Sequence, residues 1–233
     1  MIKVSPSYRQ EQLDSGEITM VDVYADIVTS CVFRFANIIA NVEHSGIAVL
    51  TLMTAVFEPV GGILRSGDAS PLDTGKNFIK GFDRLFQPAR PSQARPSSDR
   101  SLAERVYCFV RCGLFHEGFI KPRICLKASA VGIADEDGTI IIDPMKFLHD
   151  AEEQFEAFVK ELKSDDSLRL KFDNYWRRRD KKHRKELRRY WPTAAVQSRT
   201  PTGTTTIAPC ADSITLVTGT GWKSVKGHSS EEA

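Results

Sequence analysis

Arg111 and His116 are the two residues whose types and spacing are best suited to chemistry. They stand in the apolar stretch Val110–Gly118. A permanent cation and a titratable imidazole are costly in such surroundings unless they pair with, or act on, something else. An arginine can stabilise negative charge on a phosphate, and a histidine can accept the proton of a ribose 2′-hydroxyl. The pair is therefore suited to cutting RNA.

The same Arg-x4-His spacing occurs a second time, at Arg178 and His183. This second pair stands in a run with nine Lys or Arg among the thirteen residues from Arg177 to Arg189. Almost any basic pattern can be found in such a run. The surroundings separate the two pairs, because the first is embedded in apolar residues and the second in solvated ones. We interpret the second pair as a coincidence.

Helices must position Arg111 and His116, because apolar residues recur at helical spacing along much of the chain. The spacing predicts one helix over residues 17–42 and a second, mostly buried helix over residues 47–64. The turn between them is short, so we expect an antiparallel hairpin. Pro59 should kink or end the second helix. A third amphipathic helix is expected over residues 73–86.

The helix that carries the pair is expected to begin near Ser101, because Ser101 and Glu104 have the spacing of a capping box. Its residues are apolar nearly all round, and such a helix lies in a core or at a subunit interface. Residues five apart on an α-helix are about 140° apart in projection. One chain therefore does not easily aim Arg111 and His116 at a single atom.

The other segments are a β-hairpin, two further helices and polar ends. Two apolar runs around an Asp-Gly turn predict a hairpin at about residues 129–143. Pro144 starts a helix, and a basic helix follows. We therefore predict three regions. The first is a flexible N-terminus at residues 1–16, and the second is one helical domain at residues 17–191, which includes a surface loop at residues 87–98 and the basic helix at residues 168–191. The third is a disordered tail at residues 192–233 with a strand at residues 213–218.

The stretch Arg111-Cys-Gly-Leu-Phe-His116 resembles the Arg-x4–6-His motif of HEPN domains. The specific match covers about residues 100–126. The resemblance implies an all-α, antiparallel helical bundle, here with the small β-hairpin as an insertion and a flexible tail. It also implies a homodimer without cofactor or metal. Many members of the family are metal-independent ribonucleases in toxin–antitoxin, phage-defence and RNA-processing systems, and others are inactive binding or scaffolding modules.

By this resemblance, Arg111 and His116 would be the catalytic pair, and two copies across a dimer interface would build a composite site. Gly113 would let the partner's backbone come close. The supporting residues would be Cys112, Glu117 and Glu58. The chain departs from the family at Cys112, because active members often place Asn, Asp or His directly after the arginine, and a thiol is a poor substitute. The implied partners are RNA and an antitoxin or defence-system protein.

Two other interpretations of these residues remain open. Arg111 can belong to a buried network, for example with Glu58, that holds the bundle together. Three residues at helical spacing, Cys108, Cys112 and His116, with Cys125 nearby, could also bind zinc. Zinc sites are more often built from tight Cys-x2-Cys turns, so we expect no metal.

The basic helix combines cations with aromatic residues, a composition that suits an RNA backbone with stacked bases. It can equally be a solvated helix face that its Trp residues dock onto the bundle. In the first case the RNA-binding residues are Arg177, Arg178, Arg179, Lys181, Lys182, Arg184 and Lys185.

Composition limits the remaining interpretations. A formal net charge of +2 gives no global attraction to nucleic acid. The five cysteines are scattered and do not form a disulfide framework. We recognise no signal peptide at the start of the sequence. The most apolar run, residues 46–57, is too short to span a bilayer. We expect a cytoplasmic protein without a membrane partner. No Walker loop or hydrolase triad is recognisable, which leaves a ribonuclease, a non-catalytic HEPN-like dimerisation or scaffold module, or a plain helical adaptor.

Overall fold

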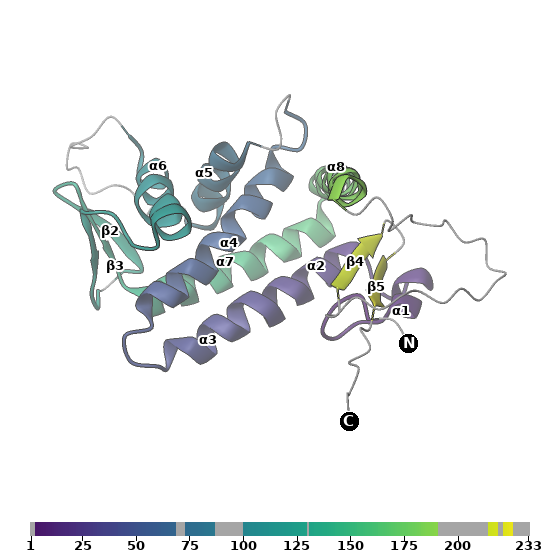
Figure 1. The fold of residues 1–233 in the computed structure, drawn as a ribbon, viewed down its shortest axis with the longest axis horizontal. Coiled ribbons are helices and arrows are strands. Elements are labelled where there is room, and N and C mark those ends of the chain that lie inside the picture. Colours follow the sequence, from purple (N-terminus) through teal and green to yellow (C-terminus); the bar gives the residue numbers. More distant parts are fainter. Residues whose placement is uncertain are drawn as a thin grey trace. The chain divides into compact units, whose positions relative to one another are not determined.

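A computed structural model describes residues 3–68, 73–86, 100–129, 131–190, 214–218 and 221–225 of the chain. The loop predicted at residues 87–98 lies outside the described residues. The chain forms two compact units. The larger is Tyr24–Tyr175, and the smaller combines the described parts of residues 1–23 and 176–233. Helices dominate the larger unit (Figure 1).

Apolar periodicity located the main helices correctly, and the mainly α-helical class is confirmed. The first predicted helix is one continuous stretch made of α2 (Met20–Val28), the π-helical turn η1 (Thr29–Phe33) and α3 (Arg34–Ala40). A short turn then leads into α4, so the expected hairpin is present. The remaining longer helices are α4 (Gly46–Leu64), α5 (Thr74–Leu85), α7 (Pro144–Ser164) and α8 (Asp166–Tyr190).

Helix α4 is the centre of the larger unit, and of the two outcomes expected at Pro59, a kink or an end, the end does not occur. The helix runs through Pro59 to Leu64. Apolar residues on both sides of the proline are fully buried, among them Phe57 and Val60. Burial of this turn outweighs the one backbone hydrogen bond that proline removes.

A glycine contact brings α4 and α5 unusually close together. A Cβ on Gly61 would collide with the backbone of Asn77, and a Cβ on Gly81 would collide with the carbonyl of Phe57. Only glycine permits this approach. Around this contact the core is built largely from phenylalanine rings that meet edge to face or stacked, namely Phe57, Phe78, Phe82, Phe86 and Phe147.

The predicted β-hairpin is present, and it belongs to a three-stranded sheet. Strands β2 (Ile133–Glu136) and β3 (Thr139–Ile142) pair antiparallel around Asp137 and Gly138, both with positive φ. This is the backbone that a two-residue hairpin turn needs. The sequence pattern did not reveal β1 (Ile124–Leu126), which pairs parallel with β3 and gives the order β1-β3-β2.

The smaller unit contains short elements near both ends of the chain, and the other residues of the tail predicted at 192–233 lie outside the described residues. The N-terminal residues predicted to be frayed hold helix α1 (Gln10–Asp14) and an isolated bridge between Lys3 and Arg9. Val4 is only 2% exposed, and its burial gives this segment a reason to be ordered. In the predicted tail, β4 (Ile214–Thr218) coincides with the expected strand, and a second strand, β5 (Gly221–Val225), pairs with it antiparallel.

Two helical stretches of the described residues are long and apolar enough to cross a membrane by length and composition alone. They are Met20–Ala40 and Gly46–Leu64. The second is mostly buried inside the structure, as a core helix of a soluble protein would be. The first is largely exposed, a feature that is considered below.

Candidate functional site on the Arg111 helix

The helix that carries Arg111 and His116 begins as a regular α-helix and then widens. It comprises α6 (Leu102–Val106), the π-helical turn η2 (Tyr107–Arg111), Cys112 and a second π-helical turn, η3 (Gly113–Glu117). We call residues 102–117 the motif helix. The expected capping box is present, because Ser101 accepts from the Glu104 backbone N–H and Glu104 accepts from that of Ser101.

The π-helical turns change the relation between Arg111 and His116. In η2 the backbone N–H of Cys112 donates to the carbonyl of Tyr107, five residues earlier. This i to i+5 pattern is the one that defines a π-helix, and such turns are often found at functional sites. A hydrogen bond between residues five apart brings those residues nearer to one face than in an α-helix. Arg111 ends the first π-helical turn and His116 lies in the second, so we expect the angle between them to be smaller than the about 140° of a regular α-helix.

Arg111 lies at the edge of the bundle, where three groups surround its guanidinium. Its Nη2 atom is 3.6 Å from Oε2 of Glu58 on α4. The guanidinium carbon also lies 4.9 Å from the centre of the Phe115 ring and 6.0 Å from that of Tyr107. The Arg111 side chain keeps 20% of its surface exposed, and that of Glu58 keeps 38%. An ion pair this long and this accessible to solvent holds the arginine weakly.

Tyr107 and Cys112 form the inner wall of this site. The Tyr107 ring packs against Phe78 of α5, with centroids 5.3 Å apart. Burial, together with the neighbouring Cys112 thiol and its hydrogen bond, raises the pKa of Tyr107. Cys112 thus has a partner inside its own chain.

His116 is exposed, and so are the apolar residues that flank it in sequence. Phe115 is 53% exposed and Phe119 is 55% exposed. The expectation that the motif helix is buried all round is therefore correct only as far as Val110, where Ala103, Val106 and Val110 are covered. Within the described part of the chain, the His116 imidazole makes no hydrogen bond or ion pair.

Gly113 has a different role from the one expected of it. A Cβ there would lie 2.5 Å from the carbonyl oxygen of Phe119, so the position is filled by the chain's own return segment and not by a partner's backbone. Gly118 makes the reversal at a φ of 78°. The Lys121 backbone N–H then donates to the carbonyl of Phe109 at 3.1 Å.

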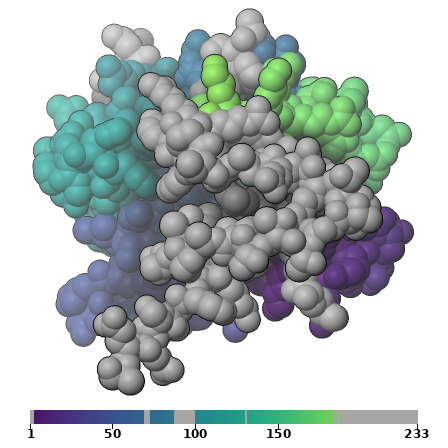
Figure 2. Space-filling view, turned by 45° about the vertical axis from the view of Figure 1, so that its right-hand side comes forward, coloured from purple at the N-terminus to yellow at the C-terminus, as the bar shows by residue number. Residues whose placement is uncertain are grey.

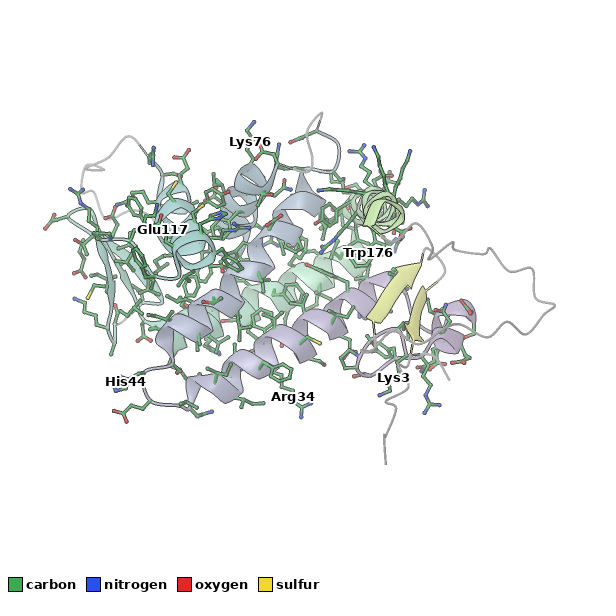
Figure 3. All side chains as sticks on the ribbon, in the orientation of Figure 1. Lys3, Arg34, His44, Lys76, Glu117 and Trp176 are labelled. Atoms are coloured by element: carbon green, nitrogen blue, oxygen red, sulfur yellow. The ribbon has the colours of Figure 1, made fainter. Side chains whose placement is uncertain are left out.

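Glu117, expected as a supporting residue, forms an ion pair with the return segment. Its carboxylate pairs with Lys121 at 2.6 Å, and this contact raises the pKa of Lys121. Figure 3 labels Glu117 beside the helix end. The ion pair thus fastens the return segment to the end of the motif helix, and it leaves His116 without a carboxylate to orient it.

The zinc interpretation gains no support from the structure. Among the described residues there is no group of three or more His, Cys, Asp or Glu arranged to hold a metal ion. Cys108 accepts a hydrogen bond from Arg100 at 3.7 Å.

The predicted RNA-binding residues lie on α8 in the smaller unit, whereas Arg111 and His116 lie in the larger one. The side chain of Arg184 lies outside the described part. The remaining predicted residues are all exposed: Arg177, Arg178, Arg179, Lys181, Lys182 and Lys185.

Sequence reasoning missed three residues of this region. Arg105 is only 5% exposed and pairs with Asp135 on β2, which fixes the first half of the motif helix to the sheet. Tyr107 and Phe115 surround Arg111. Each lies four residues from Arg111 in the sequence, and residues four apart on a helix share a face. This spacing could have predicted both contacts.

No family model, no curated protein and no solved structure matches this chain.

Proposed function

We propose that this protein binds RNA through a HEPN-like site and cuts it without a metal ion, with Arg111 and His116 as the catalytic pair. The observation that supports this most is the pair of π-helical turns in the motif helix, one ending at Arg111 and the other containing His116, because wider turns reduce the angle between residues five apart. Both chemical roles need access. Arg111 must reach a phosphate, and His116 must reach a ribose hydroxyl.

The reaction would be an internal transfer within the RNA. The 2′-hydroxyl oxygen attacks the adjacent phosphorus and gives its proton to the His116 imidazole. The bond from phosphorus to the 5′-oxygen breaks, and that oxygen takes up a proton to become a hydroxyl. The products are a 2′,3′-cyclic phosphate and a free 5′-hydroxyl end. Arg111 neutralises the charge that builds up on the non-bridging phosphate oxygens.

Glu58 would set the position of the arginine between turnovers. An RNA phosphate is a bidentate partner for a guanidinium, whereas Glu58 stands 3.6 Å away, beyond a good hydrogen bond. The phosphate can therefore displace the carboxylate at little cost. The stacking of Arg111 on Phe115 keeps the guanidinium plane aimed at the surface during this exchange.

A non-catalytic HEPN-like module is the second candidate function. It is favoured by Cys112, which stands directly after Arg111 and is engaged by Tyr107. In this case the site would bind RNA or a protein partner, such as an antitoxin or another defence-system protein, without cutting RNA. The exposed cations of α8 would supply salt-dependent affinity in either case.

The test is RNA cleavage in EDTA, with a panel of fluorescent single-stranded and hairpin RNAs. We expect wild type to produce cyclic-phosphate ends, and His116→Ala to lower the rate by about 100-fold or more, as loss of an acid–base group does. His149→Ala is the matched control, because His149 is also an exposed helical histidine but lies on α7. Cleavage that survives in His116→Ala contradicts the proposal. RNA binding by wild type without any cleavage replaces it with the second candidate.

A further inference from the structure

Helix α3 carries an apolar stripe that nothing in the described structure covers. Phe35 is 53% exposed, Ile38 is 56% exposed, and Val42, in the turn just after the helix, is 62% exposed. The free thiol of Cys31 is exposed as well. The four positions are separated by four, three and four residues. This spacing is that of the a and d positions of a coiled coil, in which a narrow apolar seam receives a second helix.

The stripe continues onto the outer side of α4. Ile47, just after the turn, is 47% exposed. Thr51, Ala55 and Glu58 follow it at helical spacing on the same side; Ala55 is exposed, and the other two are partly exposed. Glu58, the last residue of this line, contacts Arg111. Figure 2 shows a blue surface that includes α3 beside the teal surface of later residues.

Charge on this face favours a second α3 helix over a lipid surface. Arg34 is the one charged residue between Thr29 and Asn41, and it is exposed on the outer side of α3 (Figure 3). In an antiparallel pair of α3 helices, each Arg34 faces the partner's helix end near Ala40. The carbonyl groups and the negative dipole end there attract a cation, and Glu43 beyond them adds a carboxylate that is 87% exposed.

A lipid surface fits this face less well. Amphipathic helices that bind membranes carry many Lys and Arg residues on the polar side, and this face has one. The same Glu43 that suits the partner's Arg34 would be repelled by anionic lipid at the tip of the hairpin.

The size of the face suits a dimer that uses both helices. A stable interface removes about 800 Å² of surface from each partner. The stripe on α3 is only about 17 Å long at a rise of 1.5 Å per residue, which is short for that area. The outer line of α4 has to take part as well.

We propose that this face, Phe35, Ile38, Val42 and Ile47 with the outer line of α4, is the surface through which two copies of this chain associate, with their α3 helices antiparallel. In this register Phe35 packs on Ile38 of the partner subunit, and Cys31 lies opposite Val42 of the partner subunit. The inference does not rest on the proposed function, because self-association and RNA cleavage are measured separately and fail separately.

Two sets of variants test this surface in the full-length chain. Sedimentation analysis over about 1 to 100 µM, a range that brackets a weak to moderate dimer, should show a dimer for wild type. Ile38→Glu should weaken association about 100-fold or more, because it places a carboxylate at the centre of the seam. Leu170→Glu is the matched control, since Leu170 is 61% exposed on α8 and lies outside the face. It should associate as wild type does, and circular dichroism confirms that each variant is folded.

The register is tested by cross-linking. Val42→Cys should form a disulfide-linked dimer under mild oxidation, through the native Cys31 of the partner subunit, and the added change Cys31→Ser should abolish it. Within one chain the two positions are about 16 Å apart along the helix, too far for a disulfide. A wild-type protein that stays monomeric at the highest concentration overturns the proposal. So does an Ile38→Glu variant that still dimerises. A monomer that instead co-sediments with phosphatidylcholine–phosphatidylglycerol vesicles would show that lipid is the occupant of this face.

Discussion

In the first half of the motif helix, Arg105 is 5% exposed and its guanidinium pairs with Asp135 of the sheet. In the second half, Arg111 keeps 20% of its side chain exposed, and its carboxylate neighbour, Glu58, is 3.6 Å away. The first half is a regular α-helix, and the second consists of two π-helical turns. Two arginines six residues apart therefore have different tasks. Arg105 holds elements together, and Arg111 is held loosely, as the proposed function requires.

The largest expected effect is a difference in how much the two ion pairs, Arg105–Asp135 and Arg111–Glu58, contribute to the free energy of unfolding. A double-mutant cycle of Arg105→Ala and Asp135→Ala should give a coupling free energy of about 2–3 kcal/mol, because the buried pair leaves an uncompensated charge when one partner is removed. The cycle of Arg111→Ala and Glu58→Ala should give less than about 1 kcal/mol, as exposed pairs do. Urea unfolding measures both. Equal coupling free energies in the two cycles would show that the two arginines are held equally strongly, which contradicts the account.

The second effect concerns the glycine that allows the π-helical half to close on its return segment. Gly113→Ala should lower the free energy of unfolding by about 2 kcal/mol, since the added methyl meets the Phe119 carbonyl and forces the backbone to move. Gly67→Ala is the matched control, because a Cβ there meets nothing within 4 Å, and its effect should stay within about 0.5 kcal/mol. If the Gly113→Ala variant is as stable as the control, the close contact with the return segment does not hold the π-helical part of the motif helix in place.

A third, smaller loss of stability is expected when the N-terminal cap of the motif helix is removed. Ser101→Ala should cost about 1 kcal/mol, because the capping box loses the hydroxyl that accepts from Glu104. The loss should appear in thermal unfolding and leave RNA binding unchanged, since the cap belongs to the structural half. A Ser101→Ala variant that binds RNA more weakly at a temperature where it is folded would argue against this division.

The smallest effect is a pH dependence from Tyr107. Burial and the Cys112 thiol raise the pKa of Tyr107 above its ordinary value of 10.0. The folded state then holds the phenol proton more tightly than the unfolded state does. The stability that results is complete below the unfolded pKa and is lost as the pH rises through the folded pKa. Wild type should therefore lose more stability than Tyr107→Phe between about pH 8 and about pH 11, as urea midpoints would show. Parallel losses in the two proteins would contradict this.

The fold could be predicted from the sequence wherever local periodicity and caps decide it. The helices α4, α5, α7 and α8 and the β2–β3 hairpin all carry such signals. Strand β1 could not be predicted, because three residues show no period and its parallel pairing with β3 is not local. The contact between Gly61 and Gly81 depends on how two helices meet, which neither segment reveals alone.

The candidate site could be predicted only in part, for physical reasons of the same kind. The sequence identified Arg111, His116 and Glu58, which contacts Arg111, as residues to examine. It did not reveal the π-helical turns, because one additional residue per turn leaves the apolar pattern of a short segment almost unchanged. Apolar periodicity also shows which side of α3 is apolar, but it does not show whether another element covers that side. The exposure of the stripe is visible only in the folded structure.

The most direct test of the difference between the two arginines is to measure stability and RNA cleavage on the same preparation of Arg111→Ala. The account predicts that the free energy of unfolding changes by less than about 1 kcal/mol and that metal-free cleavage falls by about 100-fold or more, as it does when a transition-state charge loses its partner. An Arg111→Ala protein that cleaves RNA at the wild-type rate would contradict the account, as would one that loses several kcal/mol of stability together with its activity.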